Sequence, residues 1–511
     1  MTPTLPLPPA RDVAAAEGFV RDHLGALVDG EVIASPRFRG GQMAADAVLA
    51  SLDVTGYAAA RNEVWPAKGR GASAVSPYVR HGLLSLPLLW DAVADAPARD
   101  RQKYRDELLW QEYARHLYAR LGRATRRGLR RELAGTAWRE AGSAARPEHA
   151  SKREAHGRAA AGEGSAGIPA EPSPPAVGGE PGDAGDANEP GEAGEPGAPG
   201  APETAVWDPS MACLEVNAEE LATDGYLVNQ TRMWLASHWA VRAGVDWRAG
   251  EDVFFRHLLD GSRAANRAGW QWTIGTGSGK PYGFSRWQVE KRAPGLCDTC
   301  PLADACPIED WPEDPPLTTT EEHPKLRRDD DPEATAGPRG PRLDIATTTA
   351  TASGPRGPRL DIDTATATGA GPTGPTGPPG DAGAEVVWLT AESLGDDDPA
   401  LAAHPDLPAV FVLDAPLLAR LRLSGKRLVF LVECLADLAE RRDVTVHLGD
   451  PVEVLADRPL ATTYAPVPGW TRRAEHLDVV ATHPWPWLVR PHGGSVASFS
   501  AWRKAARGGR R

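Results

Sequence analysis

Two stretches rich in Gly, Pro and small residues interrupt this chain of 511 residues and limit how much of it can pack. The first, at 159–205, contains GGEPGDAGDANEPGEAGEPGAPGAP. The second, at 313–384, contains GPRGPRLDI at 337–345 and again at 354–362. Segments with so few apolar residues cannot bury enough surface to offset the loss of chain entropy. We therefore expect both stretches to be disordered Pro/Gly-rich linkers.

The linkers leave three blocks with globular composition, at 11–158, 206–312 and 385–506. The first two blocks show apolar residues at helical spacing, as in 99–122, which predicts an all-α domain split by the first linker. The third block alternates short β-branched runs with helical patterns such as 426–442, which predicts a parallel, Rossmann-like α/β domain. The expected fold is therefore multidomain.

Composition excludes several classes of protein. Five Cys are too few for a disulfide scaffold. The chain has no basic start followed by an apolar run, and no stretch of eighteen apolar residues, so we expect a cytoplasmic protein without a membrane partner. The formal net charge of −13 requires any nucleic-acid site to be a local basic surface. We expect a monomer.

The segment 229–272 combines five Trp with polar residues in otherwise apolar helices. Clustered Trp can simply add packing area, but it can also carry electrons or stack on flat ligands. Polar groups such as Arg232 and Asp260 are costly in such helices unless they are paired. An Arg–Asp pair facing a ring system could hold and tune a flavin.

Three of the five cysteines, Cys297, Cys300 and Cys306, lie within ten residues in a C-x2-C-x5-C pattern. This clustering favours shared ligation. Cys434 lies in an apolar helical pattern and is interpreted as a core thiol.

A run of arginines at 115–131 has no acidic residue. It is either a solvated helix end or a surface for DNA phosphates. The arginines that we select as candidate DNA contacts are Arg123, Arg126, Arg127, Arg130 and Arg131.

The motifs GYLVNQTRM, DWRAGEDVFFRHLLDG and SRAANRAGWQWTIGTG, at 225–277, resemble the flavin-binding domain of the photolyase/cryptochrome family. Segments 38–62, 71–85 and 106–118 resemble earlier motifs of that family, in the same order. The third block resembles the family's antenna domain, which usually precedes the flavin domain, so the order here is permuted.

The resemblance implies FAD as cofactor, damaged DNA as partner and a possible second antenna chromophore. The residues that it implies for FAD binding are Tyr57, Ser73, Ala74, Val75, Ser76, Arg232, Asp260 and Asn266. Those implied to meet a pyrimidine dimer, and so to be catalytic, are Glu107, Trp110, Asn229 and Met233. Trp270 and Trp247 match the first two members of the family's electron relay.

The Cys pattern also resembles the family's iron–sulfur branch, in which a fourth Cys comes from an earlier helix. Cys213 is in that place, so the resemblance implies a 4Fe–4S cluster on Cys213, Cys297, Cys300 and Cys306. Four thiolates also suit a structural zinc ion, and a decayed remnant is a third possibility.

These inferences favour a light-driven, FAD-dependent enzyme that splits cyclobutane pyrimidine dimers, a deoxyribodipyrimidine photolyase-like carbon–carbon lyase. Two other functions stay open. One is a cryptochrome-like blue-light receptor that signals through a partner, and the other is a non-catalytic iron–sulfur DNA-binding protein.

Overall fold

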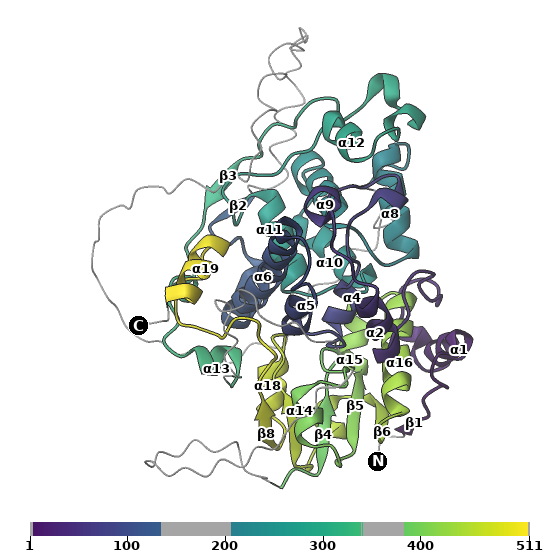
Figure 1. The fold of residues 1–511 in the computed structure, drawn as a ribbon. Helices are drawn as coiled ribbons and strands as arrows, with labels where there is room; N and C mark the ends of the chain where they lie inside the picture. Colours follow the sequence, from purple (N-terminus) through teal and green to yellow (C-terminus); the bar gives the residue numbers. More distant parts are fainter. Residues whose placement is uncertain (1–3, 134–205, 339, 341–382, 509–511) are drawn as a thin grey trace.

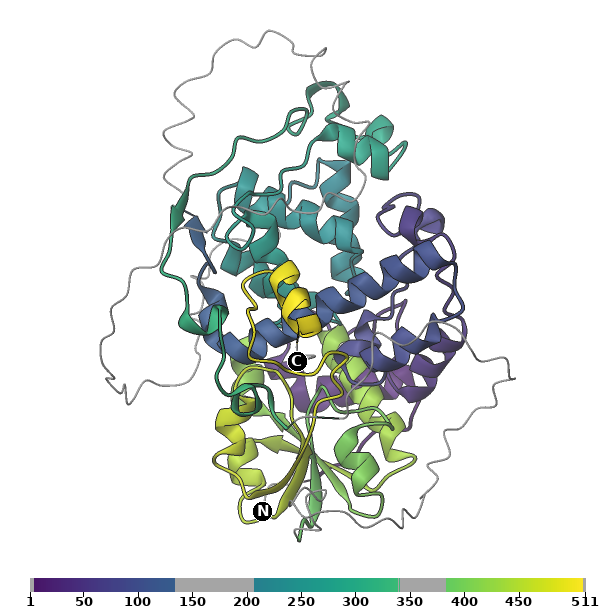
Figure 2. The same ribbon diagram turned by 60° about the vertical axis from the view of Figure 1, so that its left-hand side comes forward.

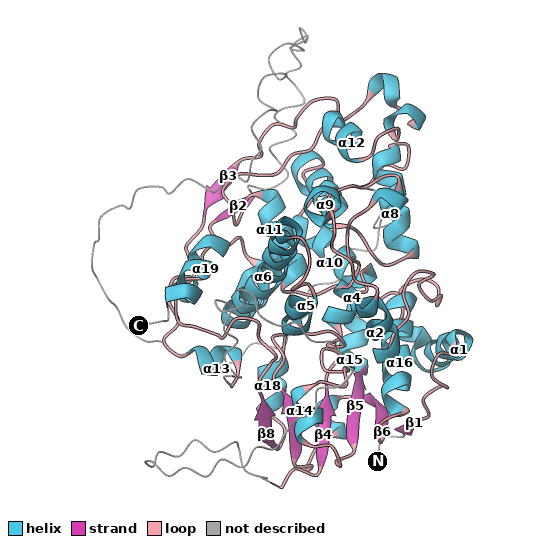
Figure 3. Ribbon diagram, viewed as in Figure 1, coloured by secondary structure: helices cyan, strands magenta, loops and turns pink. Residues whose placement is uncertain are grey.

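A computed structural model describes residues 4–133, 206–338, 340 and 383–508. Helices make up most of the part before residue 340, and a sheet flanked by helices makes up the rest (Figures 1 and 3). The first predicted linker and residues 341–382 of the second lie outside the described residues. None of the helices in the described part combines the length and apolar character needed to span a lipid bilayer.

The helical body comes from two separated segments, as predicted. Its first helices are α2 Gln42–Ala50, α3 Tyr57–Ala60, α4 Ser76–Arg80, α5 Leu86–Ala92 and α6 Ala98–Leu121. Its later helices are α8 Ala212–Thr223, α9 Asn229–Ser237, α10 Trp247–His257, α11 Ala265–Ile274 and α12 Arg286–Arg292. Helix α6 illustrates the sequence logic: Tyr104, Leu108 and Leu117 are buried on one face, and the helix ends at Gly122 with φ +50°.

The α/β part contains the predicted parallel sheet. Its strands are β4 Val386–Leu389, β5 Ala409–Asp414, β6 Val444–Gly449, β7 Leu460–Thr463 and β8 Val479–His483. They lie in the order β6-β5-β4-β7-β8, the arrangement of doubly wound sheets. The helices of this part are α14 Pro399–Ala403, α15 Ala415–Leu421, α16 Gly425–Ala439, α17 Pro451–Val454, α18 Trp470–Ala474 and α19 Phe499–Gly508. All four residues of β4 are buried, as expected for a strand covered on both faces.

The N-terminal residues join the α/β part rather than the helical body. Strand β1, Thr4–Leu5, pairs antiparallel with β6, and helix α1, Val13–Leu24, packs against α16. The sequence interpretation, which begins the helical body at residue 11, is corrected here. The reason is that the buried face of α1 meets the apolar helix α16, which is far away in the sequence.

Part of the second predicted linker is folded. Strand β3, Leu317–Thr319, pairs antiparallel with β2, Arg131–Leu133, and helix α13 spans Pro332–Ala336. Leu326 is fully buried. The boundary at 313 is therefore wrong, because pairing with β2 satisfies backbone groups that composition alone leaves exposed.

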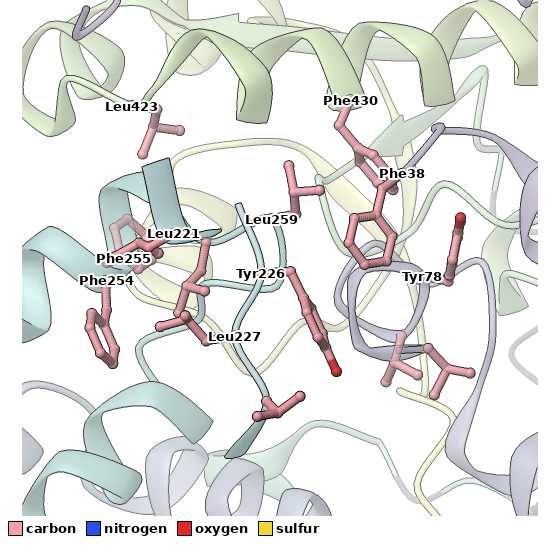
Figure 4. Packing of buried hydrophobic residues seen from close by; sticks show 14 of the residues in the cluster. Phe38, Tyr78, Leu221, Tyr226, Leu227, Phe254, Phe255, Leu259, Leu423 and Phe430 are labelled. Carbon is pink, nitrogen blue, oxygen red and sulfur yellow. The ribbon is translucent and has the colours of Figure 1, made fainter. Parts of the chain in front are cut away.

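One hydrophobic core joins the helical body to the sheet (Figure 4). Phe430 of α16 lies 5.9 Å from Tyr78 between ring centroids, and Phe38 lies 5.2 Å from Tyr226. The loop before α2 closes on the same helix, where a Cβ at Gly40 would lie 2.3 Å from the Phe430 carbonyl oxygen. This approach requires glycine, and it fixes the two parts against each other.

A second core lies on the opposite face of the sheet. Its largest buried members are Trp388, Tyr464, Trp470, Trp485 and Trp487. The many Trp of the chain thus serve packing here, away from the Trp-rich segment of the helical body.

Candidate functional site

An ion pair between α9 and the loop after α10 forms the centre of the candidate site. Arg232 Nη2 lies 2.8 Å from Asp260 Oδ2, and Arg232 Nε donates to the Leu227 carbonyl oxygen at 2.9 Å. Burial alone would lower the pKa of Arg232, but the Asp260 carboxylate outweighs burial and raises it. Asp260 Oδ1 is buried and has no hydrogen-bond partner among the described residues. A buried acceptor without a hydrogen-bond partner suits a donor group on a ligand.

Residues from the part of the helical body before the first predicted linker also lie close to the Arg232–Asp260 pair. Tyr57 and Tyr104 meet edge to face at 5.1 Å, and the Tyr226 hydroxyl interacts electrostatically with both. Tyr226 also interacts with Arg232 and Asp260, so the two halves of the helical body converge here. Burial raises the pKa of Tyr57 above its usual range and that of Tyr104 to about 12.

The predicted phosphate-binding turn, 72–76, is locally strained. Ala74 has φ +54°, in the left-handed region that residues other than glycine rarely adopt. Such strain persists only where the surroundings enforce it, and it is enriched at ligand-binding sites. Ser73, Val75 and Ser76 flank Ala74, and Ser76 opens α4.

Asn266, in the first turn of α11, is held by α10. Its amide donates to the Glu251 carbonyl oxygen at 3.1 Å. Glu251 in turn pairs with Arg263 at 2.6 Å and with Arg267 at 3.3 Å. This buried network fixes α11 against α10, and the Asn266 amide is hydrogen-bonded to α10 rather than to the Arg232–Asp260 pair.

The four residues predicted to meet a lesion occupy two helices. On α6, Glu107 pairs with Lys103 at 2.9 Å and with Arg61 at 3.4 Å, and it lies near enough to Tyr57 to raise that phenol's pKa. Trp110, one turn later, is 38% exposed. On α9, Asn229 is exposed and Met233 is half-buried. The structure thus brings Glu107 near Tyr57, one of the residues predicted to bind FAD.

The Trp rings form a different series from the one that the sequence predicts. Trp270 meets Trp239 edge to face at 6.5 Å, and Trp239 meets Trp207 at 5.3 Å. Trp247 is buried with the Arg248 guanidinium 4.7 Å from its ring centroid. Trp239 was missed as a relay candidate because sequence spacing does not show that the turn after α9 brings its ring against α11. The relay role of Trp247 stays a prediction.

All four predicted cluster ligands line one small cavity of about 20 Å³. Cys213 comes from the start of α8, and Cys297, Cys300 and Cys306 come from the loop after α12. Burial raises the pKa of Cys213 to about 12 and that of Cys297 to about 11. In the described part of the chain, no three His, Cys, Asp or Glu side chains are arranged to hold a single metal ion.

Cys434 lies elsewhere, buried in α16, where its Sγ accepts a hydrogen bond from the Gly41 amide at 3.3 Å. The prediction that Cys434 is a core thiol is confirmed.

The predicted DNA-binding arginines lie directly after α6. Side chains of α10 and α11 donate hydrogen bonds to backbone carbonyl oxygens of this segment. Gln271 donates to the carbonyl oxygens of Thr125, at 2.5 Å, and Arg127, at 2.9 Å. Arg123, Arg127 and Arg131 are exposed. Arg126 and Arg130 are half-buried; Arg126 lies 3.9 Å from Asp252, and Arg130 donates to the Ala497 carbonyl oxygen at 2.6 Å.

A larger cleft, of about 1160 Å³, lies between the helical body and the sheet. Its walls are rich in Arg and aromatic side chains, and the predicted site residues among them are Asp260, Arg123 and Arg126. Two of its arginines are strongly desolvated: burial lowers the pKa of Arg115 to about 10 and that of Arg427 to about 9. The cleft therefore offers positive charge and flat apolar surface together.

Comparison with known proteins fits this geometry. Residues 216–291, which contain the Arg232–Asp260 pair, match the FAD-binding domain of DNA photolyase. This segment is thus similar to the flavin-binding part of photolyases. The photolyase-type match covers α9, α10 and α11 and ends before the three cysteines at 297–306.

Individual relatives match short stretches of this photolyase-type domain. A deoxyribodipyrimidine photo-lyase of Vibrio cholerae is 44% identical over 64 residues, or 12% of this chain and 14% of the relative. That of Escherichia coli is 42% identical over 59 residues, or 12% of each chain. A cryptochrome DASH of Ostreococcus tauri is 37% identical over 79 residues, or 16% of this chain and 14% of the relative.

A solved structure, the class III photolyase of Agrobacterium tumefaciens, aligns with a TM-score of 0.29 and 19% identity. The alignment covers 45% of this chain and 37% of that one. The chain thus spans a small part of each curated relative that it matches.

Proposed function

We propose that this protein is a light-driven DNA repair enzyme that uses FAD to split cyclobutane pyrimidine dimers. The observation that carries the proposal is the partly buried Arg232–Asp260 pair, whose unpaired Asp260 Oδ1 lies within the FAD-binding match and beside residues from the first segment. Bound FAD would supply the photochemical electron transfer, and the protein would hold cofactor and lesion together and exclude water. The matched photo-lyases carry this activity in their names.

The residues present fit FAD. Asp260 Oδ1 would accept a hydrogen bond from the flavin ring, while Asp260 Oδ2 stays paired with Arg232. The hydroxyls of Ser73 and Ser76 and the strained turn at Ala74 would face the phosphates. Tyr57, half-buried beside Tyr104 and near Glu107, would line the pocket between the two halves of the body.

The lesion would enter beside α6 and α9. Flipping a base pair out of the helix costs a few kcal/mol, and least where stacking is already disturbed by damage. Trp110 would stack on the flipped bases, and Glu107 would accept a hydrogen bond from a base edge. The exposed arginines Arg123, Arg127 and Arg131 would contact phosphates, so a single copy of the chain could hold the strand.

We further propose that the four cysteines hold a 4Fe–4S cluster. Four thiolates from two distant segments converge on one cavity, which is the donor set that such clusters use. Metal or cluster binding would displace the protons that burial holds on Cys213 and Cys297. Iron and acid-labile sulfide in the purified protein would support the cluster, whereas zinc alone would support a structural zinc site.

The Arg-rich cleft between body and sheet is our candidate site for a second, light-harvesting chromophore. Its size suits a drug-sized to dinucleotide-sized ligand, and its arginines suit an anion. A second chromophore in the purified protein, lost on Arg115→Leu without loss of FAD, would support this assignment.

The repair proposal is tested with purified protein, fully reduced flavin and an oligonucleotide that carries one thymine dimer. We expect dimer loss under blue light and none in the dark. Unchanged dimer in the light, with FAD bound, would instead favour a light receptor that signals through a partner, the function suggested by the match to a cryptochrome. A protein with a broad iron–sulfur band and no flavin spectrum would leave a non-catalytic DNA-binding role.

A further inference from the structure

The C-terminal helix α19 packs directly against the proposed lesion-binding face of α6 (Figure 2). Phe499, its first residue, stacks on Trp110 with ring centroids 4.4 Å apart and planes 9° from parallel. Tyr113 meets the same Trp110 ring edge to face at 5.7 Å. Because Phe499 covers one face of the indole, the 38% of Trp110 that is exposed belongs to its other face and its edge.

Helix α19 is anchored firmly to this position. Trp502, one turn after Phe499, is fully buried against Tyr113 and His116 of α6. Arg503 forms an ion pair with Asp106 of α6 at 3.0 Å. These contacts leave Phe499 little freedom to leave the Trp110 ring.

The segment that leads to α19 is also tied to α6. The Tyr113 hydroxyl donates to the Val496 carbonyl oxygen at 3.0 Å, and the Val489 amide donates to Glu112 Oε1 at 2.8 Å. Arg120 Nη1 donates to the Gly494 carbonyl oxygen at 2.5 Å. The segment between β8 and α19 therefore runs along α6 and is held against it by these hydrogen bonds.

We propose that Phe499 is a positioning residue, which holds the Trp110 indole in the orientation that stacks on an unpaired base. The inference rests on the proposed function, and it makes the C-terminal helix part of the DNA site. An exposed Trp without such backing can rotate between rotamers, and it must lose that freedom when a base stacks on it. A fixed aromatic neighbour removes this cost in advance, so the free face of Trp110 is ready for a base.

The test is a double-mutant cycle on the full-length chain with Phe499→Ala, Trp110→Ala and the double variant. The measured quantity is the Kd for two single-stranded probes, one with a thymine dimer and one undamaged. Stacking on an aromatic residue is available to any base, so both probes report on Trp110. We expect Phe499→Ala to raise Kd about 2- to 10-fold, the range of aromatic pairs, in the wild-type background. In the Trp110→Ala background we expect it to change Kd less than about 1.7-fold, the lower end of the error of additivity.

Two further variants separate positioning from packing. Phe499→Tyr keeps the aromatic face and should bind both probes with the wild-type Kd. Phe499→Leu keeps apolar cover without the ring, so it should resemble Phe499→Ala, and it replaces that variant if the latter does not fold. FAD content and the rate of flavin photoreduction without DNA should not change in any of them.

Equal effects of Phe499→Ala in both backgrounds, or wild-type binding by Phe499→Leu, would overturn the proposal. Equal binding of both probes by the wild-type protein would contradict dimer recognition, which belongs to the proposed function. The double-mutant cycle measured on the undamaged probe would still decide the role of Phe499. Loss of FAD in Phe499→Tyr would show a structural role and also overturn it.

Discussion

Among single residues, the Arg232–Asp260 pair supports the most direct prediction. Asp260→Ala leaves the partly buried Arg232 guanidinium without its carboxylate partner and removes the unpaired acceptor Oδ1. We expect most of the FAD to be lost on purification, with FAD per chain measured by flavin absorbance after denaturation. Asp330→Ala removes an exposed carboxylate and should leave FAD unchanged. Full occupancy in Asp260→Ala would contradict the assignment of the flavin pocket.

The series of Trp207, Trp239 and Trp270 rings predicts which Trp would carry electrons to bound flavin. Trp239→Phe keeps most of the packing between Trp270 and Trp207 but replaces the indole with a ring that is much harder to oxidise. We expect slower flavin photoreduction in the presence of an external thiol, measured by absorbance without DNA. Trp247→Phe is the matched comparison. If Trp247→Phe blocks photoreduction and Trp239→Phe does not, the sequence-based relay holds and ours fails.

Residue types were more predictable from sequence than residue contacts. Arg232 and Asp260 stand out because charged groups are costly in apolar surroundings unless they are paired, and they do pair. The Trp239 contact depends on the turn of His238–Arg242 after α9, which changes the phase of the helix and has no sequence signal. The role of Asn266 in FAD binding stays a prediction, and the structure adds that its amide nitrogen is hydrogen-bonded to Glu251 of α10.

Among the elements, the cap of α14 predicts a pH effect on stability. The Asp398 carboxylate accepts hydrogen bonds from the Ala400 amide and the Thr463 hydroxyl, yet burial raises its pKa from 3.8 to about 6. The folded protein thus holds this proton more tightly than the unfolded chain does. This contribution to stability is present below pH 4 and is lost as pH rises to 6, at a cost of about 3 kcal/mol.

Asp398→Asn keeps an oxygen acceptor and removes the charge. We expect it to raise the Tm at pH 7 and to flatten the fall in Tm between pH 4 and 6, measured by thermal unfolding. Asp450→Asn at the cap of α17 is the matched control, since it makes the same kind of cap. A lower Tm for Asp398→Asn at pH 7 would show that its ionised form stabilises the fold.

Element types followed from local pattern, whereas element partners did not. The alternating β-branched runs identify the parallel strands because a buried sheet needs continuous apolar residues. Strand β3 was taken for linker because its residues, Leu317–Thr319, are few and polar, and only β2 gives them a partner. Helix α1 was assigned to the wrong part for the same reason, since its amphipathic face does not reveal that it packs on α16.

For the whole molecule, the shared core means that the sheet supports the flavin site. Arg427 of α16 is 4% exposed, and its Nη2 donates to the Gly261 carbonyl oxygen at 2.6 Å. Arg80 of α4 donates to the same carbonyl oxygen at 2.9 Å. Hydrogen bonds from the helical body and from the α/β part therefore hold the loop that follows Asp260. The sequence does not reveal this contact, because the two parts are far apart in the chain.

These hydrogen bonds predict that a residue of the α/β part controls FAD affinity. Arg427→Met keeps the apolar stem over Phe255 but removes the hydrogen bonds to the Phe255 and Gly261 carbonyl oxygens. Each buried hydrogen bond to a charged group is worth about 1.5–3 kcal/mol, so a loosened loop should raise the Kd for FAD at least tenfold in reconstitution titrations. Arg422→Ala, just before α16, loses only a contact with the Ala26 carbonyl oxygen and should bind FAD normally. Equal affinity in Arg427→Met and Arg422→Ala would show that the helical body holds the flavin loop without help from the sheet.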